Sequence, residues 1–327
     1  MSSPPPRPPA GLRVLLTHLI DYAGLFPPAR LPLDEALRSY VRYRRSDEAW
    51  MLGRFVLPAA RLGELPARAG RVGDAGPIPL SVLATGGADA PAFMDALSKD
   101  LAAMTALTSH HGDLARPAAM EARLPVACLA ADLAPLRSFF DGVTAQTVPF
   151  LTDTPAVFFE VPLSDDLPRL LPPVLDALAA CRDEAGRPRL GLKLRTGGLT
   201  PEAIPPPDRL AFALTAARRA GVPLKTTAGL HHPVRHVDPH LGVPLYGFFN
   251  VFVAAVLDRL HALDETTLHT ILTETSAEAF HFSEEGLAWR DLSATLEDVR
   301  NAREAVIAFG SCSFDEPRDD LRRLGLL

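Results

Sequence analysis

Lysine is scarce in this sequence. The chain has 327 residues and 33 basic ones, but only Lys99, Lys193 and Lys225 are lysines and the others are arginines. Arginine stays charged in proteins, whereas a buried lysine can lose its proton and act as a base or nucleophile. Lysines kept in an arginine-dominated chain therefore indicate sites where a guanidinium cannot substitute, although chance retention with ordinary ion pairing also fits a lone lysine.

Other shortages exclude whole classes of protein. The three cysteines, Cys128, Cys181 and Cys312, are far apart and odd in number, which argues against a disulfide framework and for reduced thiols in the cytoplasm. A net charge of −6 gives no basic surplus for binding nucleic acid or an anionic membrane. No uninterrupted apolar run reaches the roughly 18 residues of a membrane span. The sequence leaves homo-oligomerisation open.

The order of apolar and helical segments predicts an α/β barrel. Residues 1–11 are proline-rich and predict a disordered leader, and residues 12–327 predict one barrel domain. Continuously apolar runs alternate with helical stretches, as in parallel strands buried on both faces. Six such units favour a (β/α)8, TIM-barrel-like fold with an irregular last quarter. The six predicted strands are Arg54–Pro58, Leu80–Ala84, Ala122–Val126, Ala156–Pro162, Leu190–Leu194 and Val222–Thr226.

The two ends of the chain follow this pattern less clearly. Leu12–Ile20 and Leu296–Phe309 are predicted as helices, and Ala60–Ala69 as a weak one. Tyr246–Asn250 is strand-like before a helical stretch. Two short runs separated by Glu-Glu-Gly, between residues 279 and 290, suggest a strand or a small hairpin.

Reactive side chains in a barrel lie at the carboxyl ends of the strands. This rule selects Glu160, Lys193, Arg195 and Lys225. Lys193 and Arg195 share a face of their strand, so an amine and a guanidinium converge if that face points inward. Arg195 would hold a substrate carboxylate or phosphate, and the neighbouring cation would lower the lysine pKa. Glu160 would either accept a proton or form an ion pair with one of these cations.

Residues beside these strand ends are candidates for contacting a substrate. Glycine and threonine turns leave backbone N–H groups able to approach an anion, although glycine also marks such turns for steric reasons. A polar asparagine inside an apolar run needs a partner if it is buried, whether in a site or in the framework. The substrate-binding candidates are Thr196, Gly197, Gly198, Thr227, Gly229 and Asn250.

Four histidines lie within ten residues: His231, His232, His236 and His240. Imidazole is a good ligand for zinc and other transition metals, which makes His232, His236 and His240 candidate metal ligands. Their spacing matches no familiar metal motif, and His231 or His232 would equally serve as a proton-transferring or substrate-contacting group. No cofactor is favoured, and a divalent metal remains an alternative.

Three further residues have open roles. Asp21 and Tyr22 lie in a loop-like segment from which they could reach a site. Cys312 lies in a small-residue loop, where a reactive thiol would need a nearby base. A buried, structural cysteine is the favoured interpretation.

The sequences LKTTAG at Lys225 and LKLRTGG at Lys193 resemble barrel-type class I aldolases, the deoxyribose-phosphate aldolase family among them. In that family one strand lysine forms a Schiff base and a second strand lysine tunes it. The resemblance covers only these two stretches. It implies that Lys225 is the Schiff-base lysine and Lys193 its electrostatic partner, without settling their order. The motifs IDYAGLFPP, KLRTGG, KTTAGLHHP and FGSCSFDEP together also resemble a bacterial family, which adds nothing about chemistry.

Three hypotheses follow from these patterns. The first is an aldolase-like lyase that acts on a small anionic carbonyl compound through Lys225 or Lys193, with Glu160 or His231 moving protons. The second is a metal-dependent hydrolase, lyase or isomerase that uses the histidine cluster with Glu160 or Asp238. The third is a non-catalytic barrel that binds a metabolite or a protein partner.

Overall fold

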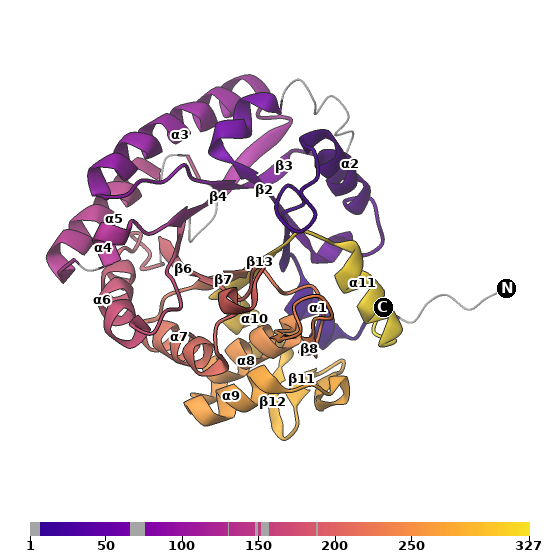
Figure 1. Cartoon of the computed structure of the whole chain (residues 1–327). Coiled ribbons are helices and arrows are strands. Elements are labelled where there is room, and N and C mark those ends of the chain that lie inside the picture. The colour runs from indigo at the N-terminus through magenta and orange to yellow at the C-terminus, as the bar shows by residue number, and fades with distance from the viewer. Residues whose placement is uncertain (1–6, 66–75, 130, 148–149, 152–156, 188) are drawn as a thin grey trace.

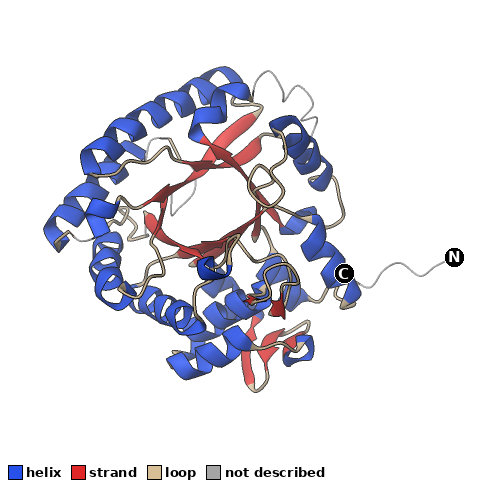
Figure 2. Ribbon diagram, viewed as in Figure 1, coloured by secondary structure: helices blue, strands red, loops and turns tan. Residues whose placement is uncertain are grey.

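The structure is a computed structural model of the whole chain, and it describes residues 7–65, 76–129, 131–147, 150–151, 157–187 and 189–327. Eight parallel strands close into a barrel, with helices around its outside (Figures 1 and 2). The strand order around the barrel is β1-β13-β7-β6-β5-β4-β3-β2. The predicted TIM-barrel-like fold is therefore confirmed. Among the described residues no helix is both long and apolar enough to cross a membrane.

The barrel strands have the following bounds: β1 Ile20–Tyr22, β2 Leu52–Pro58, β3 Ile78–Leu83, β4 Ala115–Arg123, β5 Val157–Glu160, β6 Leu190–Arg195, β7 Leu224–Thr227 and β13 Val306–Ser311. The helices are α1 Ala10–Leu16, α2 Leu33–Tyr43, α3 Ala90–His111, α4 Val126–Leu129, α5 Leu133–Thr147, α6 Leu167–Ala180, α7 Pro207–Ala220, α8 Phe248–His261, α9 Glu265–Thr273, α10 Leu296–Arg303 and α11 Asp315–Arg323.

Short elements complete the fold. They are the 3₁₀ turns η1 Ala49–Met51, η2 Ala59–Glu64, η4 Pro201–Ala203 and η5 Ala277–Ala279, the β8 His236–Val237 and β9 Pro244–Leu245 pair, and the antiparallel sheet of β10 Phe280–Phe282, β11 Gly286–Trp289 and β12 Leu292–Thr295.

Local chemistry explains where several elements begin and end. The Asp89 side chain accepts a hydrogen bond from the Ala92 backbone and starts α3. Thr295 and Asp298 form a capping box at the start of α10. Gly221 ends α7 with φ +64, a left-handed conformation that glycine adopts without steric cost, and the chain then enters β7. Because the strands of the closed barrel are parallel, their carboxyl ends, and the polar residues there, lie at one rim.

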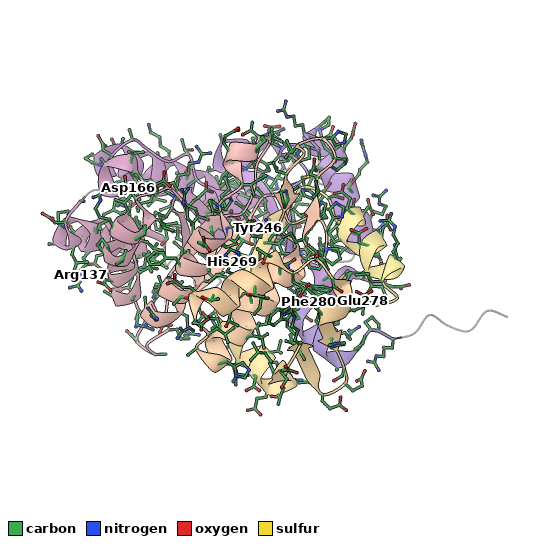
Figure 3. The ribbon with its side chains drawn as sticks, turned by 60° about the horizontal axis from the view of Figure 1, so that its bottom comes forward. Arg137, Asp166, Tyr246, His269, Glu278 and Phe280 are labelled. Atoms are coloured by element: carbon green, nitrogen blue, oxygen red, sulfur yellow. The ribbon has the colours of Figure 1, made fainter. Side chains whose placement is uncertain are left out.

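The helices after β7 form a second layer outside the barrel. Figure 3 shows this side, with Tyr246 and His269 on it. The Tyr246 hydroxyl donates to the Pro205 carbonyl at 2.7 Å, and His269 bonds to Asp208, so α9 is joined to α7. The three-stranded sheet of β10–β12 packs beside α8, where the Phe280 and Phe249 rings lie with their centroids 5.9 Å apart and their planes tilted by 42°. Helix α8 of this layer packs against β13, where Phe248 stacks on Phe309.

Four sequence predictions are corrected by the structure. The predicted helix at the N-terminus ends at Leu16, and Ile20 belongs to strand β1. The predicted final helix stops at Arg303, and β13 follows after two residues. Asn250 lies in α8 and not in a strand. Ala60–Ala69 contains a 3₁₀ turn in its described part, and residues 66–69 lie outside the described residues, as do residues 1–6 of the predicted leader.

Candidate functional site

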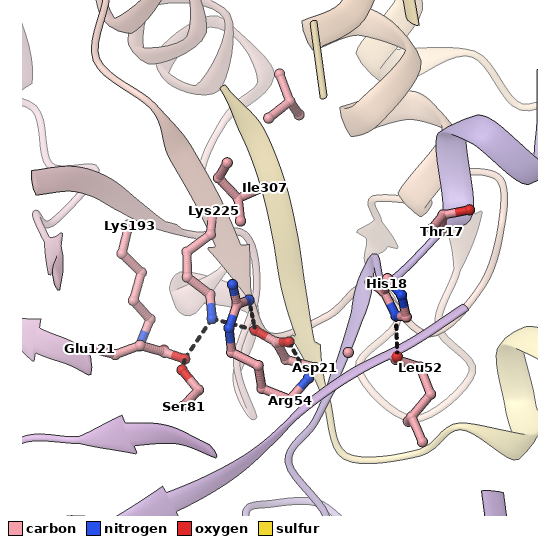
Figure 4. A network of polar contacts seen from close by, with 12 residues as sticks. Thr17, His18, Asp21, Leu52, Arg54, Ser81, Glu121, Lys193, Lys225 and Ile307 are labelled. Atoms are coloured by element: carbon pink, nitrogen blue, oxygen red, sulfur yellow. Dashed lines mark hydrogen bonds and ion pairs between the residues drawn. The ribbon is translucent and has the colours of Figure 1, made fainter. Parts of the chain in front are cut away.

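Lys225 is buried inside the barrel. It lies on β7, and its relative exposure is 0%. Its Nζ donates to Asp21 Oδ2 at 2.7 Å and to Glu121 Oε1 at 2.6 Å (Figure 4). The same ammonium lies 5.7 Å from the centroid of the Phe158 ring. A barrel core normally holds branched apolar side chains at this level, so a full charge here indicates a purpose other than packing.

Lys193 lies on the neighbouring strand β6, in register with Lys225. Its Nζ is 2.8 Å from Glu121 Oε2 and 3.0 Å from Glu160 Oε2. Arg195 Nε then donates to Glu160 Oε1 at 3.2 Å. The Arg195 side chain is 42% exposed and that of Lys193 only 5%. The structure thus brings Glu160, Lys193 and Arg195 together, with Arg195 toward solvent at the carboxyl ends of the strands.

These contacts form one chain of alternating charge across the barrel, which we call the charge chain. Glu121 is its centre, because this one carboxylate holds both lysines. Four cations alternate with three anions, and each end of the chain is an arginine. In order, its members are Arg54, Asp21, Lys225, Glu121, Lys193, Glu160 and Arg195.

Ion pairing decides the protonation of Glu121 and Lys193 in the charge chain. Burial alone would raise the pKa of Glu121, but the ammonium groups of Lys193 and Lys225 hold that pKa well below its usual range. Burial would likewise lower the pKa of Lys193, but the carboxylates of Glu121 and Glu160 outweigh burial and raise that pKa. The prediction that a neighbouring cation lowers the lysine pKa is therefore wrong for Lys193, because two carboxylates lie closer than any cation.

Backbone and small residues position the carboxylates. The Ser81 hydroxyl on β3 donates to Glu121 Oε1 at 2.6 Å. The Arg54 backbone N–H on β2 donates to Asp21 Oδ1 at 2.7 Å. Gly53 leaves room for that carboxylate, since a Cβ on Gly53 would lie only 2.4 Å from Asp21 Oδ1. Each carboxylate thus has a bond besides its lysine, which fixes its direction.

Sequence reasoning missed Glu121, Ser81 and Arg54, and it treated Asp21 as part of a loop. Glu121 directly precedes the predicted strand run at Ala122, which in fact starts at Ala115. Its signal in the sequence is a lone glutamate within a run of small and apolar residues. An acidic residue inside a buried strand needs a cation, and the chain's two strand lysines supply one.

The predicted glycine and threonine turns hold β6 and β7 to each other. Thr196 Oγ1 donates to the Ala228 carbonyl at 2.6 Å, and the Thr196 backbone N–H donates to Thr227 O at 2.9 Å. A Cβ on Gly197 would lie 2.9 Å from the Gly229 Cα, so the two loops touch through their backbones. This close approach accounts for both glycines by sterics. Similarly, a Cβ on Gly198 would lie 2.4 Å from the Cβ of Ala203.

Asn250 has a structural position. It is fully buried in α8, away from the charge chain. Its Oδ1 accepts from the Arg235 backbone at 2.7 Å, and its Nδ2 donates to the Ile271 and Glu274 carbonyls at 2.8 Å each. Both amide hydrogens are engaged, so the arrangement supports the framework interpretation of this residue.

His231 pairs with Cys312 and Glu316 at the carboxyl ends of β7 and β13. Its Nδ1 lies 2.8 Å from Glu316 Oε2, and its Nε2 lies 3.8 Å from Cys312 Sγ. Burial would lower the pKa of His231, but the hydrogen bonds to Cys312 and Glu316 raise it to about 10. The Cys312 thiol therefore has an imidazole within reach, and Glu316 orients that ring.

The other histidines of the cluster do not converge on one point. His232 bonds to Asp320, and its ring contacts that of His236 with centroids 4.2 Å apart. The His240 backbone caps a turn by donating to Asp238 Oδ1 at 2.8 Å. In the part of the chain that the structure describes, no three His, Cys, Asp or Glu side chains are grouped so as to hold a metal ion. The predicted metal ligands gain no support from this arrangement.

The charge chain can hold an anion, move protons and present an amine. Arg195 is a guanidinium near the mouth of the barrel, and Glu160 can exchange a proton with the adjacent Lys193. Comparisons with known proteins supply no family: no protein-family model matches the chain, and no curated protein sequence matches it significantly.

Proposed function

We propose that the protein is an aldolase-like barrel enzyme that forms an imine between a strand lysine and a small anionic carbonyl compound. The observation that carries the proposal is the shared carboxylate Glu121, which lies 2.8 Å from Lys193 and 2.6 Å from Lys225 inside the barrel. Two buried amines on one carboxylate are costly to maintain for stability alone, because apolar residues of similar volume pack at least as well.

Lys193 is the amine that we assign to the carbonyl. It is the lysine that contacts Glu160, whose other oxygen reaches the partly exposed Arg195. Lys225 is enclosed between Asp21 and Glu121 and is fully buried. This assignment reverses the order that the aldolase resemblance implies and makes Lys225 the electrostatic partner.

Because the resting Lys193 is an ammonium, substrate binding must release its proton. A substrate carboxylate or phosphate on Arg195 competes with Glu160 for the guanidinium. Glu160, with one cation fewer, accepts the proton from Lys193, and the neutral amine adds to the carbonyl carbon. One proton of the added nitrogen passes to the new alkoxide oxygen, which becomes a hydroxyl. Glu160 then returns the proton that it took to this hydroxyl, which leaves as water, and the product is an iminium beside Glu121. The iminium is an electron sink for cleavage of a carbon–carbon bond.

Reductive trapping tests the proposal. The protein is treated with borohydride and glyoxylate, pyruvate or glyceraldehyde 3-phosphate in turn, and the modified peptides are found by mass spectrometry. We expect an adduct on Lys193 with at least one compound. Lys193→Met should abolish the adduct, while Lys99→Arg, a change at an exposed lysine on α3, should leave it unchanged. Equal labelling of Lys99 and Lys193, or none, would contradict imine chemistry.

A non-catalytic metabolite-binding barrel is the second candidate. The raised pKa of Lys193 favours it, since Glu121 and Glu160 hold the ammonium in its charged form. On this hypothesis Lys193→Arg keeps ligand affinity nearly intact, because charge alone suffices. On the imine hypothesis the same variant loses trapping and turnover but keeps affinity for the anionic part of the substrate.

A further inference from the structure

A cavity of about 530 Å³ lies inside the amino-terminal end of the barrel, opposite the strand ends described above. Its lining comes from β2, β3, β4 and β13, from His18 ahead of β1, and from the end of α2 and the segments that lead into β2 and β13. Small residues create it: Gly53, Pro79 and Ala118 occupy barrel positions below the charge chain where other barrels hold bulky side chains. The volume is in the range of small-molecule sites.

The charged groups that the described residues contribute to this cavity are all basic. Among the described lining residues the ionisable side chains are His18, Tyr40, Arg44, Arg54 and Arg303, and none is an aspartate or glutamate. Arg54 forms an ion pair with Asp21, and Asp21 also forms one with Lys225, so one carboxylate is shared by two cations. The described lining thus offers several basic groups to a ligand, in a cavity that is partly open to solvent.

Arg303 is fixed in place without a carboxylate. Its guanidinium donates to the backbone carbonyls of Val306, Ile307 and Thr17, the last two at 2.6 and 2.9 Å. No ion pair to Arg303 exists among the described residues, and its buried Nε has no hydrogen-bond partner there. Burial, and after it the charge of Arg54, lowers the pKa of Arg303 to about 10. A guanidinium whose Nε is buried without a hydrogen-bond partner or counter-ion in the described structure is stabilised by an anion that joins it.

From the cavity, its basic lining and the unpaired Arg303 we infer a second binding site, for a compact phosphate- or carboxylate-bearing molecule held by Arg54 and Arg303. Guanidinium groups suit such oxyanions because they donate two parallel hydrogen bonds. The site also communicates with the charge chain. An anion that draws the Arg54 guanidinium from Asp21 leaves Lys225 as the charged partner of that carboxylate among the described residues (Figure 4). The bound anion thereby strengthens the pairing of Lys225.

Titration calorimetry with inorganic phosphate and, separately, malonate tests the site and distinguishes the two oxyanion sources. We expect saturable binding of one molecule per chain for at least one probe. Arg303→Gln should weaken it at least tenfold. Ala118→Met, which fills the cavity and changes no charge, should also weaken it at least tenfold. Arg38→Gln, an exposed arginine on α2, is the matched control and should leave affinity unchanged.

The results separate this site from the proposed active site. Lys193→Met, which removes the imine-forming amine, should leave phosphate or malonate binding in place. Arg195→Gln should do the same. Absence of saturable binding for both probes would overturn the inference. So would binding that survives both Arg303→Gln and Ala118→Met, or that is lost in Arg195→Gln alone. If Arg303→Gln unfolds, as circular dichroism would show, Ala118→Met decides the question.

Discussion

Replacing Glu121 with glutamine should destabilise the protein strongly. The change keeps the shape of the side chain and removes the one carboxylate that holds both Lys193 and Lys225. Removing one partner of a buried ion pair costs roughly 3–5 kcal/mol, because a charge is left buried without compensation. Asp21 and Glu160 remain as partners of the two lysines, but each of these carboxylates is also paired with an arginine. Since domains are stable by only about 5–15 kcal/mol, the loss would be a large share of the total.

The pH dependence of this effect follows from the pKa of Glu121. That pKa is lowered in the folded protein, so the carboxylate stabilises the fold above its unfolded pKa, and this contribution is lost as the pH falls through the folded value. The stability difference between the wild type and Glu121→Gln should be full at pH 7. It should shrink below about pH 4.3, where the unfolded carboxyl binds its proton.

Urea denaturation followed by circular dichroism measures the free energy of unfolding for both proteins at several pH values. The double variant Glu121→Gln with Lys225→Met is the internal test, because it removes one anion and one cation together. We expect the double variant to lose less unfolding free energy than the two single variants lose together. The difference should be at least about 1 kcal/mol, as for residues that interact directly. A Glu121→Gln variant within about 0.5 kcal/mol of the wild type at pH 7, or strictly additive single effects, would refute the reasoning.

Two other substitutions test the surroundings of the site. Cys312 should react with iodoacetamide faster than Cys128 or Cys181, because the His231 ring, whose pKa is raised to about 10, lies 3.8 Å from its Sγ. His231→Ala should slow the reaction about tenfold, and peptide mass spectrometry against time would show an unchanged rate if the pairing is irrelevant. Asn250→Ala should lower the free energy of unfolding by roughly 2–4 kcal/mol, since three buried backbone groups lose their partner; thermal melting measures this, and a loss of activity without destabilisation would instead indicate a site role.

The central strands could be predicted from the sequence because each is a continuous apolar run between a helical stretch and a turn. The first and last strands could not. β1 has three residues and follows α1 closely, and two residues separate β13 from α10. In the sequence, each strand was therefore predicted as a continuation of the helix before it. The hydrophobicity of a short buried segment is the same in a helix and in a strand, and the barrel closure that decides between them is a long-range property.

The candidate site divides in the same way. Alternation along one strand was enough to place Lys193 and Arg195 on the same face. Glu121 and Asp21 reach these residues from strands far away in the sequence, and only the closed barrel brings them together. Whether the pKa of Lys193 is raised or lowered depends on its contacts with carboxylates from other strands. The prediction that considered only the neighbouring cation was therefore wrong. The cavity at the amino-terminal end of the barrel exists because several small side chains leave space unfilled, and no single residue in the sequence predicts it.

The most direct test of the central claim uses the small number of lysines. A protein labelled with ¹⁵N at lysine side chains contains three labelled Nζ atoms, from Lys99, Lys193 and Lys225. NMR at neutral pH should show two slowly exchanging, hydrogen-bonded ammonium groups, because two of these atoms are held by buried carboxylates. Addition of a reactive carbonyl compound should convert the Lys193 signal alone to an iminium signal. Conversion of the Lys99 signal, or unchanged spectra with every carbonyl compound that binds, would contradict the claim that Lys193 forms an imine.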